Sequence, residues 1–390
     1  MMCSSHPPTP GRQFNGLWTT IVLVGIPLLS VSPVGAQVRF ETQVIDPQID
    51  KVCYSLTVAD VNGDGKTDLV GVSDRAVYWY QNPGWKRQTL IADQTLRDNV
   101  CIAPHDIDGD GKVDFALGAG WTGTGTLQWL SRSDSPEKNW TVHRIGTIRW
   151  TPRMRFADVL GKGKPQLVVS PLNRTEGKGV ALTAFEIPGN PATDRWKATV
   201  INGELNRMHN HWHVDHDGDE KIDTLTASQE GVHLIRRQGS AFFSKRLTSA
   251  AAGEVKTGKF VGGNPLLVTI EPMHGTHAVA YATLNGKQKR MVLVENLRQG
   301  HAVWLANLDD DPEDEIVIGH REKGTAEITG PGLYLFDFDS ETQKWSRQVI
   351  DSAIAVEDAL AADFDGDGKV DLAAGGRTTH NVKIYWNRGK

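Results

Sequence analysis

The chain has 390 residues, of which 39% are hydrophobic and 23% are charged, and its formal net charge is −5. This balance is that of a globular protein long enough to bury a large core. The charge is spread along the chain without a basic stripe, so no nucleic-acid partner is expected. Outside the N-terminal segment, no stretch is long and apolar enough to cross a bilayer.

Residues 1–36 have the pattern of a secretion signal. Arg12 precedes an apolar stretch from Leu17 to Leu29, and Val34-Gly35-Ala36 supplies the small residues of a cleavage site. An uncleaved membrane anchor is the alternative, which is disfavoured because a proline interrupts the apolar stretch. We therefore expect a secreted or periplasmic protein, free of the membrane after cleavage, whose mature part is residues 37–390.

The mature chain repeats a short acidic loop. Four segments are near copies of one another, namely DVNGDGKTD from Asp60, DIDGDGKVD from Asp106, DHDGDEKID from Asp215 and DFDGDGKVD from Asp363. NLDDDPEDE from Asn307 is a looser copy, and two degenerate copies place further anchors at Asp158 and Lys259. The anchors lie roughly 50 residues apart, which is the period of an architecture built from repeated supersecondary units.

Each unit continues in the same way after its loop. In the first unit an apolar strand spans Leu69 to Val72, and VYWYQN and KRQTLIA then supply an aromatic-rich strand and a strand with basic and β-branched residues. With the strand that leads into the loop, a unit holds about four strands, the usual content of a propeller blade. We therefore predict an all-β fold, a seven-bladed β-propeller with four antiparallel strands per blade, as a single domain over residues 37–390.

The two ends of the mature chain are predicted to close the ring. After Asp363 there is room for three strands of a blade but not for a fourth. The segment Arg39 to Asp46 (RFETQVID) is similar to the outer strand of other units, such as SRQVID. We expect the N-terminal strand to complete the seventh blade, because closure removes open sheet edges.

Oxygen-bearing side chains recur at positions 1, 3, 5 and 9 of the acidic loops. Alternating oxygen ligands in a glycine-containing turn suit a hard cation, so we expect structural Ca²⁺ that staples the loops and does no chemistry. A network of turns made by Asp and Asn side chains without an ion is the alternative. The expected ligands are Asp60, Asn62, Asp64, Asp68, Asp106, Asp108, Asp110, Asp114, Asp215, Asp217, Asp219, Asp223, Asn307, Asp309, Asp311, Glu315, Asp363, Asp365, Asp367 and Asp371.

The repeated D-x-D-G-D-G-x-x-D, followed by an apolar strand, resembles the FG-GAP or VCBS repeat, and the resemblance covers the mature chain. It implies a propeller of the kind found in integrins, sugar lyases and many secreted bacterial proteins. The resemblance is specific for the fold and not for the function, because this fold hosts many activities.

Two cysteines remain in the mature chain. Cys53 and Cys101 fall on the predicted innermost strands of adjacent blades. An exported protein permits a disulfide between them, and two free buried thiols are the alternative.

Function is expected from residues that depart from the repeat. His209 and His211 precede the fourth acidic loop on a predicted innermost strand, where alternate side chains share a face. His209 and His301 stand at the same offset before their loops, as do Tyr54 and Glu357. Equivalent offsets in different blades should form one ring around the central channel.

The turn after each blade's second strand should face the same mouth of the channel. Polar and aromatic side chains that converge on one concavity are typical of a ligand site. A structural interpretation stands beside this one, because a channel histidine commonly bonds a water or a backbone group, and His211 can pack between blades. The residues expected at this mouth, or just before a loop beside it, are His105, Trp121, Glu271, His274, His320, Arg321 and Arg377.

The histidines also suggest a transition-metal site. An H-x-H pair with a third histidine from another strand is a known zinc arrangement. His209 and His211, together with His274 or His301, are the candidate ligands for Zn²⁺ or another divalent ion.

Four strings, APHDIDGDG, MHNHWHVDHDGD, EPMHGTHAVAY and GHAVWLANLDDDPEDEIVIGHR, together resemble the propeller domain of the aldos-2-ulose dehydratase family. Members of this family act on keto-sugars such as 1,5-anhydrofructose, and the fungal enzymes carry cupin domains, linked to a later isomerisation, after the propeller. Because this chain ends at Lys390 with the ring just closed, we expect only the step that eliminates water. The resemblance implies a secreted carbon–oxygen lyase that acts on a keto-sugar or a related keto-glycoside.

That elimination fits the residue types at the predicted mouth. A base of near-neutral pKa removes the C–H proton beside the carbonyl, and histidine has such a pKa. The expected base is His209 or His211, and the expected acid is His301 or His274, with Tyr54 as a further proton donor. The other assignments are Arg321 as the clamp for the enolate or substrate, Trp121 as a surface on which the sugar stacks, and His105, Glu271, His320, Glu357 and Arg377 as substrate contacts.

Two other classes of function stay open. A polysaccharide lyase would remove the C5 proton of a uronate and neutralise the carboxylate with arginines or calcium, and a long basic groove would favour it. A non-catalytic calcium propeller would bind carbohydrate or protein, as the integrin head does, although clustered histidines disfavour a pure adhesion surface. The sequence carries no signal for an oligomeric state.

Overall fold

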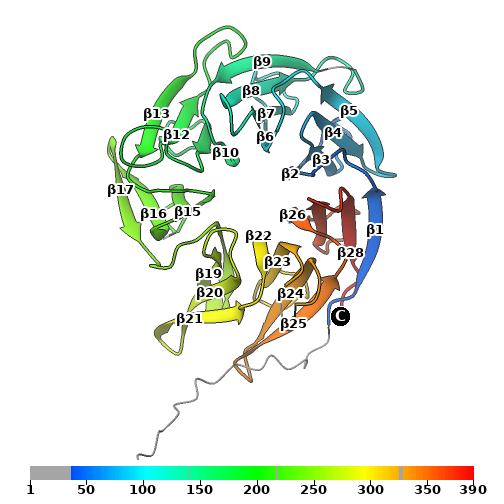
Figure 1. Cartoon of the computed structure of the whole chain (residues 1–390), viewed down its shortest axis with the longest axis vertical. Helices are drawn as coiled ribbons and strands as arrows, with labels where there is room; N and C mark the ends of the chain where they lie inside the picture. Colours follow the sequence, from blue (N-terminus) through cyan, green and yellow to red (C-terminus); the bar gives the residue numbers. More distant parts are fainter. Residues whose placement is uncertain (1–36, 139, 217, 325–327) are drawn as a thin grey trace, which may run out of the picture. The chain divides into compact units, whose positions relative to one another are not determined.

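The computed structural model describes residues 37–138, 140–216, 218–324 and 328–390, which belong to one compact unit, Val31–Lys390. These residues form seven four-stranded sheets, which stand as blades around a central opening (Figure 1). The strands within each sheet are antiparallel, and the described residues include no α-helix. The all-β, seven-bladed propeller predicted from the repeat is therefore confirmed. The expected signal, residues 1–36, lies outside the described residues.

The first four blades follow one another in the chain, each from an innermost strand at the channel to an outermost strand at the rim. Blade 1 consists of β2 (Ser55–Ala59), β3 (Asp68–Val72), β4 (Ala76–Gln81) and β5 (Lys86–Ala92). Blade 2 consists of β6 (Cys101–His105), β7 (Asp114–Ala119), β8 (Thr126–Ser131) and β9 (Thr141–Gly146). Blade 3 consists of β10 (Arg153–Ala157), β11 (Gln166–Ser170), β12 (Leu182–Glu186) and β13 (Lys197–Asn202). Blade 4 consists of β14 (Asn210–Val214), β15 (Asp223–Ser228), β16 (Gly231–Gln238) and β17 (Ala241–Arg246).

Three further blades complete the described ring. Blade 5 consists of β18 (Glu254–Phe260), the 3₁₀ turn η1 (Val261–Gly263), β19 (Asn264–Glu271), β20 (His277–Leu284) and β21 (Lys287–Val294). Blade 6 consists of β22 (Arg298–Ala306), β23 (Glu315–Glu322), β24 (Gly332–Asp339) and β25 (Lys344–Asp351). Blade 7 consists of β26 (Val356–Ala362), β27 (Asp371–Gly376), β28 (Val382–Asn387) and β1 (Phe40–Asp46).

Blade 7 takes its outermost strand from the other end of the mature chain. The sheet order is β1-β28-β27-β26, and Phe40 of β1 pairs with Asn387 of β28. The ring closure expected from the segment Arg39–Asp46 is therefore confirmed.

No helix in the described part of the chain has the length and apolarity needed to cross a membrane.

The core lies between neighbouring blades. One cluster joins Val70 and Trp79 of blade 1 to Phe115 and Leu117 of blade 2, all of them fully buried. Second strands such as β3 (DLVGV) are buried along their whole length because blades cover both faces, which explains their continuous apolar sequence.

Cys53 and Cys101 are both buried as free thiols. The disulfide that the sequence left open is therefore not formed.

The acidic loops connect the first strand of a blade to its second strand. After β2, the N–H groups of Gly63 and Gly65 donate to the two carboxylate oxygens of Asp60 at 2.7 and 2.8 Å. Both glycines have a positive φ, 79° and 81°, which other residues rarely adopt. Asp68 closes the loop by accepting from the N–H of Val61. Because innermost strands end at these loops, their starting residues gather at the opposite mouth of the channel.

Candidate functional site

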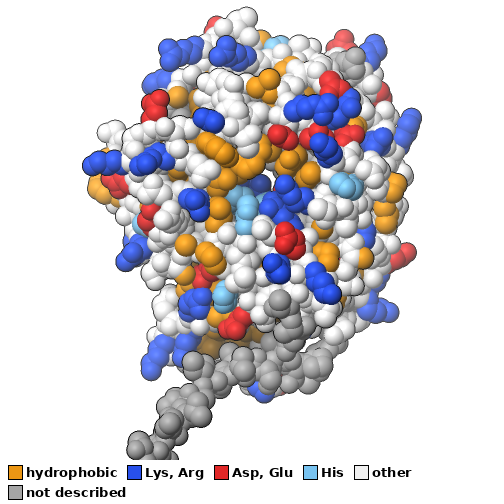
Figure 2. All heavy atoms as spheres, in the orientation of Figure 1, with side chains coloured by type: hydrophobic (Ala, Val, Ile, Leu, Met, Phe, Trp, Pro, Cys, Tyr) orange, Lys and Arg blue, Asp and Glu red, His pale blue; other side chains and the backbone are white. Residues whose placement is uncertain are grey.

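A cavity of about 130 Å³ lies at the mouth of the channel opposite the acidic loops. On the face drawn in Figure 2, histidine, basic and apolar side chains gather around a central hollow. In the described chain, all seven blades or the segments that enter them contribute to the cavity. Its lining is Tyr54, Val100, Trp121, Pro152, Arg153, Leu172, His209, His274, His301, Arg321, Glu357 and Arg377.

Two kinds of chain position supply this lining. The first kind lies where an innermost strand begins: Tyr54 and His209 directly precede their strands, Glu357 is the second residue of β26, and His301 is the fourth residue of β22. The second kind lies at or just after the end of a second strand, and antiparallel pairing brings that end to the same mouth. In blade 7, Val356 of β26 pairs with Gly376 of β27, and Arg377 comes next. The structure thus brings together the ring that equal offsets predicted.

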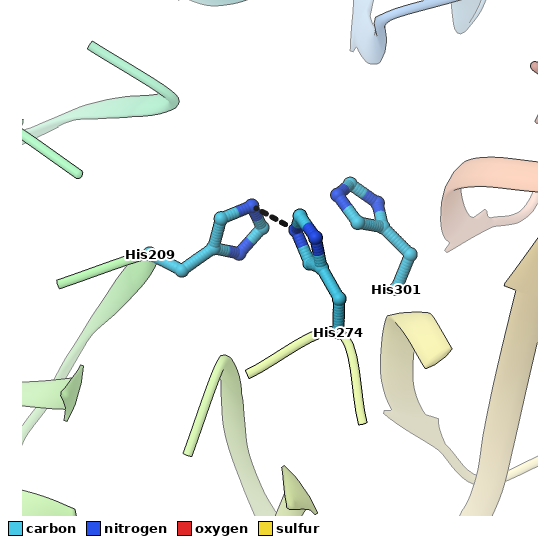
Figure 3. A group of neighbouring side chains, drawn as sticks. All are labelled: His209, His274 and His301. Carbon is cyan, nitrogen blue, oxygen red and sulfur yellow. Dashed lines mark hydrogen bonds between the residues drawn. The ribbon is translucent and has the colours of Figure 1, made fainter. Parts of the chain in front are cut away.

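His274 reaches the cavity from the turn between β19 and β20. The turn is tight, since a Cβ atom at Gly275 would lie 2.1 Å from the carbonyl oxygen of Pro272. His274 itself has a φ of 47°, which is uncommon for a residue other than glycine. Such a conformation persists where the surroundings hold it in place. Here it directs the imidazole toward His209 (Figure 3).

The imidazoles of His209, His274 and His301 converge on one point (Figure 3). The Nε2 atoms of His209 and His274 lie 3.1 Å apart. One ring nitrogen from each of the three histidines lies within 4.8 Å of the others. The ring centroids of His209 and His274 are 4.6 Å apart, and each lies 4.9 Å from the centroid of His301.

The outer nitrogens of two of these rings have oxygen partners. His209 Nδ1 donates to the carbonyl oxygen of Gly253 at 3.2 Å, and Glu254 Oε1 lies 2.8 Å from the same nitrogen. His301 Nδ1 donates to the carbonyl oxygen of Glu357. Because Nδ1 carries the proton in both rings, Nε2 presents a lone pair to the cavity. Carbonyl and carboxylate partners of this kind orient metal-binding histidines.

Two of the three imidazoles, those of His274 and His301, are held in the neutral form. Burial, and after it the neighbouring His209, lowers the pKa of His274 to about 2. Burial, followed by the charge of Arg321, holds the pKa of His301 well below its ordinary value. Neutral imidazole is the form that binds a metal ion. The 3.1 Å between the Nε2 atoms of His209 and His274 fits either an N–H···N hydrogen bond from neutral His274 to the lone pair of His209 or two nitrogens that share one cation.

The donor set fits a tetrahedral transition metal. Zinc binds histidine nitrogen at about 2.0–2.1 Å, which separates two ligand nitrogens by about 3.3 Å. The 3.1 Å between the Nε2 atoms of His209 and His274 is close to this spacing. Three histidines facing a cavity that leaves a fourth position open are the donor set of catalytic zinc sites. In the described residues, the histidine candidates for the metal are thus His209, His274 and His301, without His211.

Glu357, paired with two arginines, and the hydroxyl of Tyr54 are further polar groups of the cavity lining. Glu357, 3% exposed, accepts from Arg321 Nη2 at 2.7 Å and from Arg377 Nη1 at 2.9 Å. The Tyr54 hydroxyl donates to Asp98 Oδ1 at 3.2 Å. Burial, and then Asp98, raises the pKa of Tyr54 to about 12, so its hydroxyl stays protonated and can donate a proton.

His211 does not reach the cavity. It is fully buried, and its Nδ1 lies 3.0 Å from Ser170 Oγ of blade 3. The expectation that His209 and His211 share a face is wrong, because His209 lies before β14 begins and turns toward blade 5. The structural interpretation, in which His211 packs between blades, is the one that the structure shows.

Three other residues expected at the mouth also lie outside the cavity lining. His105 stacks on Phe156 with ring centroids 4.7 Å apart, beside the acidic loop of blade 2. Glu271 is buried and accepts from an arginine of β21 at 2.6 Å. His320 is buried and stacks on Tyr334 at 5.5 Å. By contrast, Trp121, Arg321 and Arg377 line the cavity as expected.

Arg153 and Glu254 are functional candidates that the sequence did not single out. Arg153 lines the cavity, and Glu254 lies against His209. Both are the first residues of innermost strands, β10 and β18. His209 and His301 stand at one offset before the first position of their acidic loops. The same offset before Asp158 and Lys259, the anchors of the two degenerate loops, falls next to Arg153 and Glu254. Because these two loops have lost the acidic pattern, the offset was not applied to them in predicting the site.

Three acidic loops bring carboxylate oxygens within 4.8 Å of one another. The groups are Asp106, Asp108 and Asp114; Asp363, Asp365 and Asp371; and Asp309, Asp311 and Glu315 with Asp337, which the sequence did not single out. The expected ligand Asp217 lies outside the described residues. Asp114 accepts from the N–H groups of Ile107 and Arg132, and burial raises its pKa to about 7. The hydrogen-bond network of the ion-free alternative is thus formed, and Ca²⁺ stays a prediction.

Comparison with known proteins supports the fold and the repeat. Residues 60–117 match the model of the FG-GAP-like repeat family. No curated protein matches the sequence. Similar solved structures include an Agrocybe aegerita lectin that recognises non-reducing terminal N-acetylglucosamine, at 14% identity and a TM-score of 0.51 over 87% of this chain and 85% of that one. They also include BBS1N in complex with ARL6DN, at 12% identity and a TM-score of 0.54 over 90% of this chain and 97% of that one.

At these identities the two structures are similar to this chain in fold alone. The repeat match and the ring of sheets agree with each other and with the spacing of the acidic loops. The chain is a seven-bladed β-propeller that contains the FG-GAP-like repeat.

Proposed function

We propose that the protein is an exported metal-dependent carbon–oxygen lyase that eliminates water from a keto-sugar such as 1,5-anhydrofructose. The observation that carries the proposal is the convergence of His209, His274 and His301 in a cavity at the channel mouth. Export is proposed from the pattern of residues 1–36. The lyase activity is proposed from the resemblance of the histidine-bearing segments to the aldos-2-ulose dehydratase family, together with the chemistry of the cavity.

The three histidines would hold a divalent ion of the zinc type through nitrogens that face the cavity. When bound, such an ion would polarise the carbonyl oxygen of the sugar and acidify the neighbouring C–H bond. His209 then serves as a ligand and not as the base expected from the sequence, because its Nδ1 is already directed at Gly253 and Glu254. The same reassignment applies to His301, whose Nδ1 is bound by a backbone carbonyl.

The remaining polar groups of the cavity divide the proton transfers between them. Glu357 supplies the one carboxylate in the described lining, and it would take the proton from the carbon beside the carbonyl. Tyr54, protonated at neutral pH because of its raised pKa, would donate a proton to the departing hydroxyl. The C–O bond then breaks and water leaves. Arg321 and Arg377, which are held by Glu357, would bind the sugar's oxygen atoms.

Turnover of 1,5-anhydrofructose by the zinc-loaded protein tests the proposal. An ultraviolet absorption that grows with time would report the enone product. His301→Ala should abolish this signal and leave the melting temperature of the metal-free protein nearly unchanged. His233→Ala is the matched control, because His233 bonds Ser244 within blade 4 and lies outside the cavity. Binding of the sugar without enone formation would instead identify a carbohydrate-binding propeller and overturn the lyase.

A further inference from the structure

A second and larger cavity lies deeper in the channel. Its volume is about 350 Å³, within the range of small-molecule sites. Residues of all seven innermost strands, β2, β6, β10, β14, β18, β22 and β26, line it. Arg153 lines both this cavity and the one with the histidines, so it stands between the two. The function proposed above makes no use of this deeper space.

Lys256 of β18 is a buried lysine that makes no ion pair with a carboxylate of the described residues. It is 4% exposed, and its Nζ atom has no hydrogen-bond partner among the described residues. The Nζ atom lies 3.2 Å from the ring centroid of Trp212 and 3.9 Å from that of Trp304. Aromatic faces compensate a buried ammonium only in part, because they replace its hydration with a weak attraction.

A second cation shares the same aromatic residue. The Arg155 guanidinium carbon lies 5.0 Å from the centroid of the Trp212 ring. Arg155 Nη1 donates to Asn210 Oδ1 at 2.9 Å and to the carbonyl oxygen of His211 at 2.6 Å, and both acceptors are neutral. No ion pair of Arg155 with a carboxylate occurs among the described residues. Arg155 and, when it is protonated, Lys256 therefore bring two positive charges to one cavity.

The two carboxylates in the lining are already engaged. Asp358 accepts from Ser55 Oγ at 3.1 Å and from the N–H of Leu56 at 2.9 Å. Glu254 accepts from Asn210 and lies 3.8 Å from Arg153 Nη2. With Arg153 counted, three cations face two carboxylates in this cavity. Burial first, and the charge of Arg155 next, lowers the pKa of Lys256 well below its ordinary value, as expected for unbalanced positive charge.

From this imbalance we infer that the channel cavity binds a small oxyanion, a carboxylate or a phosphate, between Lys256 and Arg155. An anion there would neutralise the excess charge and give Lys256 Nζ the acceptor that it lacks. Arg155 would keep its two neutral acceptors and offer its remaining N–H groups. The inference concerns the middle of the channel and requires neither a metal ion nor catalysis at the mouth.

Calorimetric titration of the full-length protein tests this site. Sodium glucuronate represents a small carboxylate, sodium phosphate represents an inorganic oxyanion, and glucose is the neutral control. We expect at least one of the two anions to bind and glucose not to bind at this site. Binding of glucuronate alone identifies a carboxylate site, and binding of phosphate alone identifies a phosphate site. Failure of both anions to bind overturns the inference.

Lys256→Met removes the charge and keeps the length of the side chain. It should weaken anion binding by about tenfold or more, because one charged partner is lost. Lys383→Met is the matched control, since Lys383 is also buried but has a carboxylate partner, with Nζ 2.7 Å from Asp351 Oδ2. That variant should lose stability and retain anion binding. Unchanged binding in Lys256→Met would show that Lys256 is a structural lysine held by its tryptophans.

Crystals of the wild-type protein soaked in sodium selenate provide a test that needs no variant. The anomalous signal of selenium should mark a site within hydrogen-bonding distance of Lys256 Nζ. If phosphate binds in the titration, a selenium site elsewhere, or none, would contradict the inference whatever the variants do. If glucuronate alone binds, crystals soaked in glucuronate replace those in selenate, and a map without its carboxylate beside Lys256 Nζ would contradict the inference.

Discussion

His209 Nε2 and His274 Nε2 lie 3.1 Å apart, although the two residues are 65 positions apart in the chain and belong to adjacent blades. Burial lowers the pKa of His274 to about 2, so its ring is neutral and either donates an N–H hydrogen bond to His209 Nε2 or binds a cation beside it. His301 directs a third nitrogen at the same point. A metal ion would account for the direction of all three nitrogens with one bound group.

The carboxylate of Glu254 should set the metal affinity without touching the metal. Glu254 Oε1 lies 2.8 Å from His209 Nδ1, the nitrogen on the far side of the ring. Glu254→Gln removes this negative charge and keeps the shape, so zinc affinity should fall by about 10–100-fold. Competition with a chromophoric chelator measures the change. Zinc affinity equal to that of the wild type would show that Glu254 serves only the packing around Arg153.

The arginine–glutamate pair of the cavity should matter for turnover. Arg321 binds Glu357 through two nitrogens, at 2.5 and 2.7 Å, which lysine cannot reproduce. Arg321→Lys should lower kcat/KM for the keto-sugar by about tenfold or more, because the sugar and Glu357 lose their fixed partner. Arg290→Lys is the control, since Arg290 pairs with Glu271 away from the cavity. Equal losses in both variants would point to a general effect on folding.

Calcium should stabilise the acidic loops. A ligand that binds only the folded state at a hundred times its Kd adds about 2.7 kcal/mol to the free energy of unfolding. Calcium should therefore raise the melting temperature of the wild type, and Asp108→Asn with Asp110→Asn should reduce that rise. Asp158→Asn is the control, because Asp158 binds backbone N–H groups in a loop without the acidic pattern. If a chelator leaves the melting of the wild type unchanged, the loops hold their shape by hydrogen bonds alone.

Acid should destabilise the protein through His213, a partly buried histidine of β14. Burial lowers the pKa of His213 from 6.5 to about 3, so the unfolded chain takes up a proton that the folded chain refuses. Stability is complete above pH 6.5 and is lost as the pH falls toward 3, by about 1.4 kcal/mol per pH unit for such a group. Urea unfolding of the protein in the presence of a metal chelator, repeated at several pH values, measures how the free energy of unfolding changes with pH.

His213→Gln should make the free energy of unfolding fall less steeply as the pH is lowered. Thr224→Val is the control, because it removes the 3.1 Å hydrogen bond to His213 Nδ1 and keeps the titrating ring. An identical pH dependence in the wild type and in His213→Gln would assign the acid sensitivity to other groups.

The fold was predictable because one loop recurs with the same glycines. Gly63 and Gly65 occupy positions that need a positive φ, and the same spacing in other units counts the blades. The similarity of Arg39–Asp46 to outer strands then predicted the closure that β1 and β28 form. These are local requirements of the backbone, which a sequence records directly.

The site was predictable only in part. The offset from the loops placed His209 and His301 on one ring, and the structure brings them together with His274. The alternation of a strand failed for His211, because His209 lies one residue before the strand begins. Lys256 could not be recognised, since only the packing of β14, β18 and β22 shows that its Nζ lies against two tryptophans and forms no ion pair with the described residues.

Diffraction from zinc-soaked crystals at the zinc absorption edge tests the metal centre most directly. The account predicts an anomalous peak about 2.0–2.2 Å from one nitrogen each of His209, His274 and His301. The peak should be absent from crystals of His301→Ala. A map with zinc only at the acidic loops, or with no zinc at all, would contradict the metal centre and the lyase mechanism built on it.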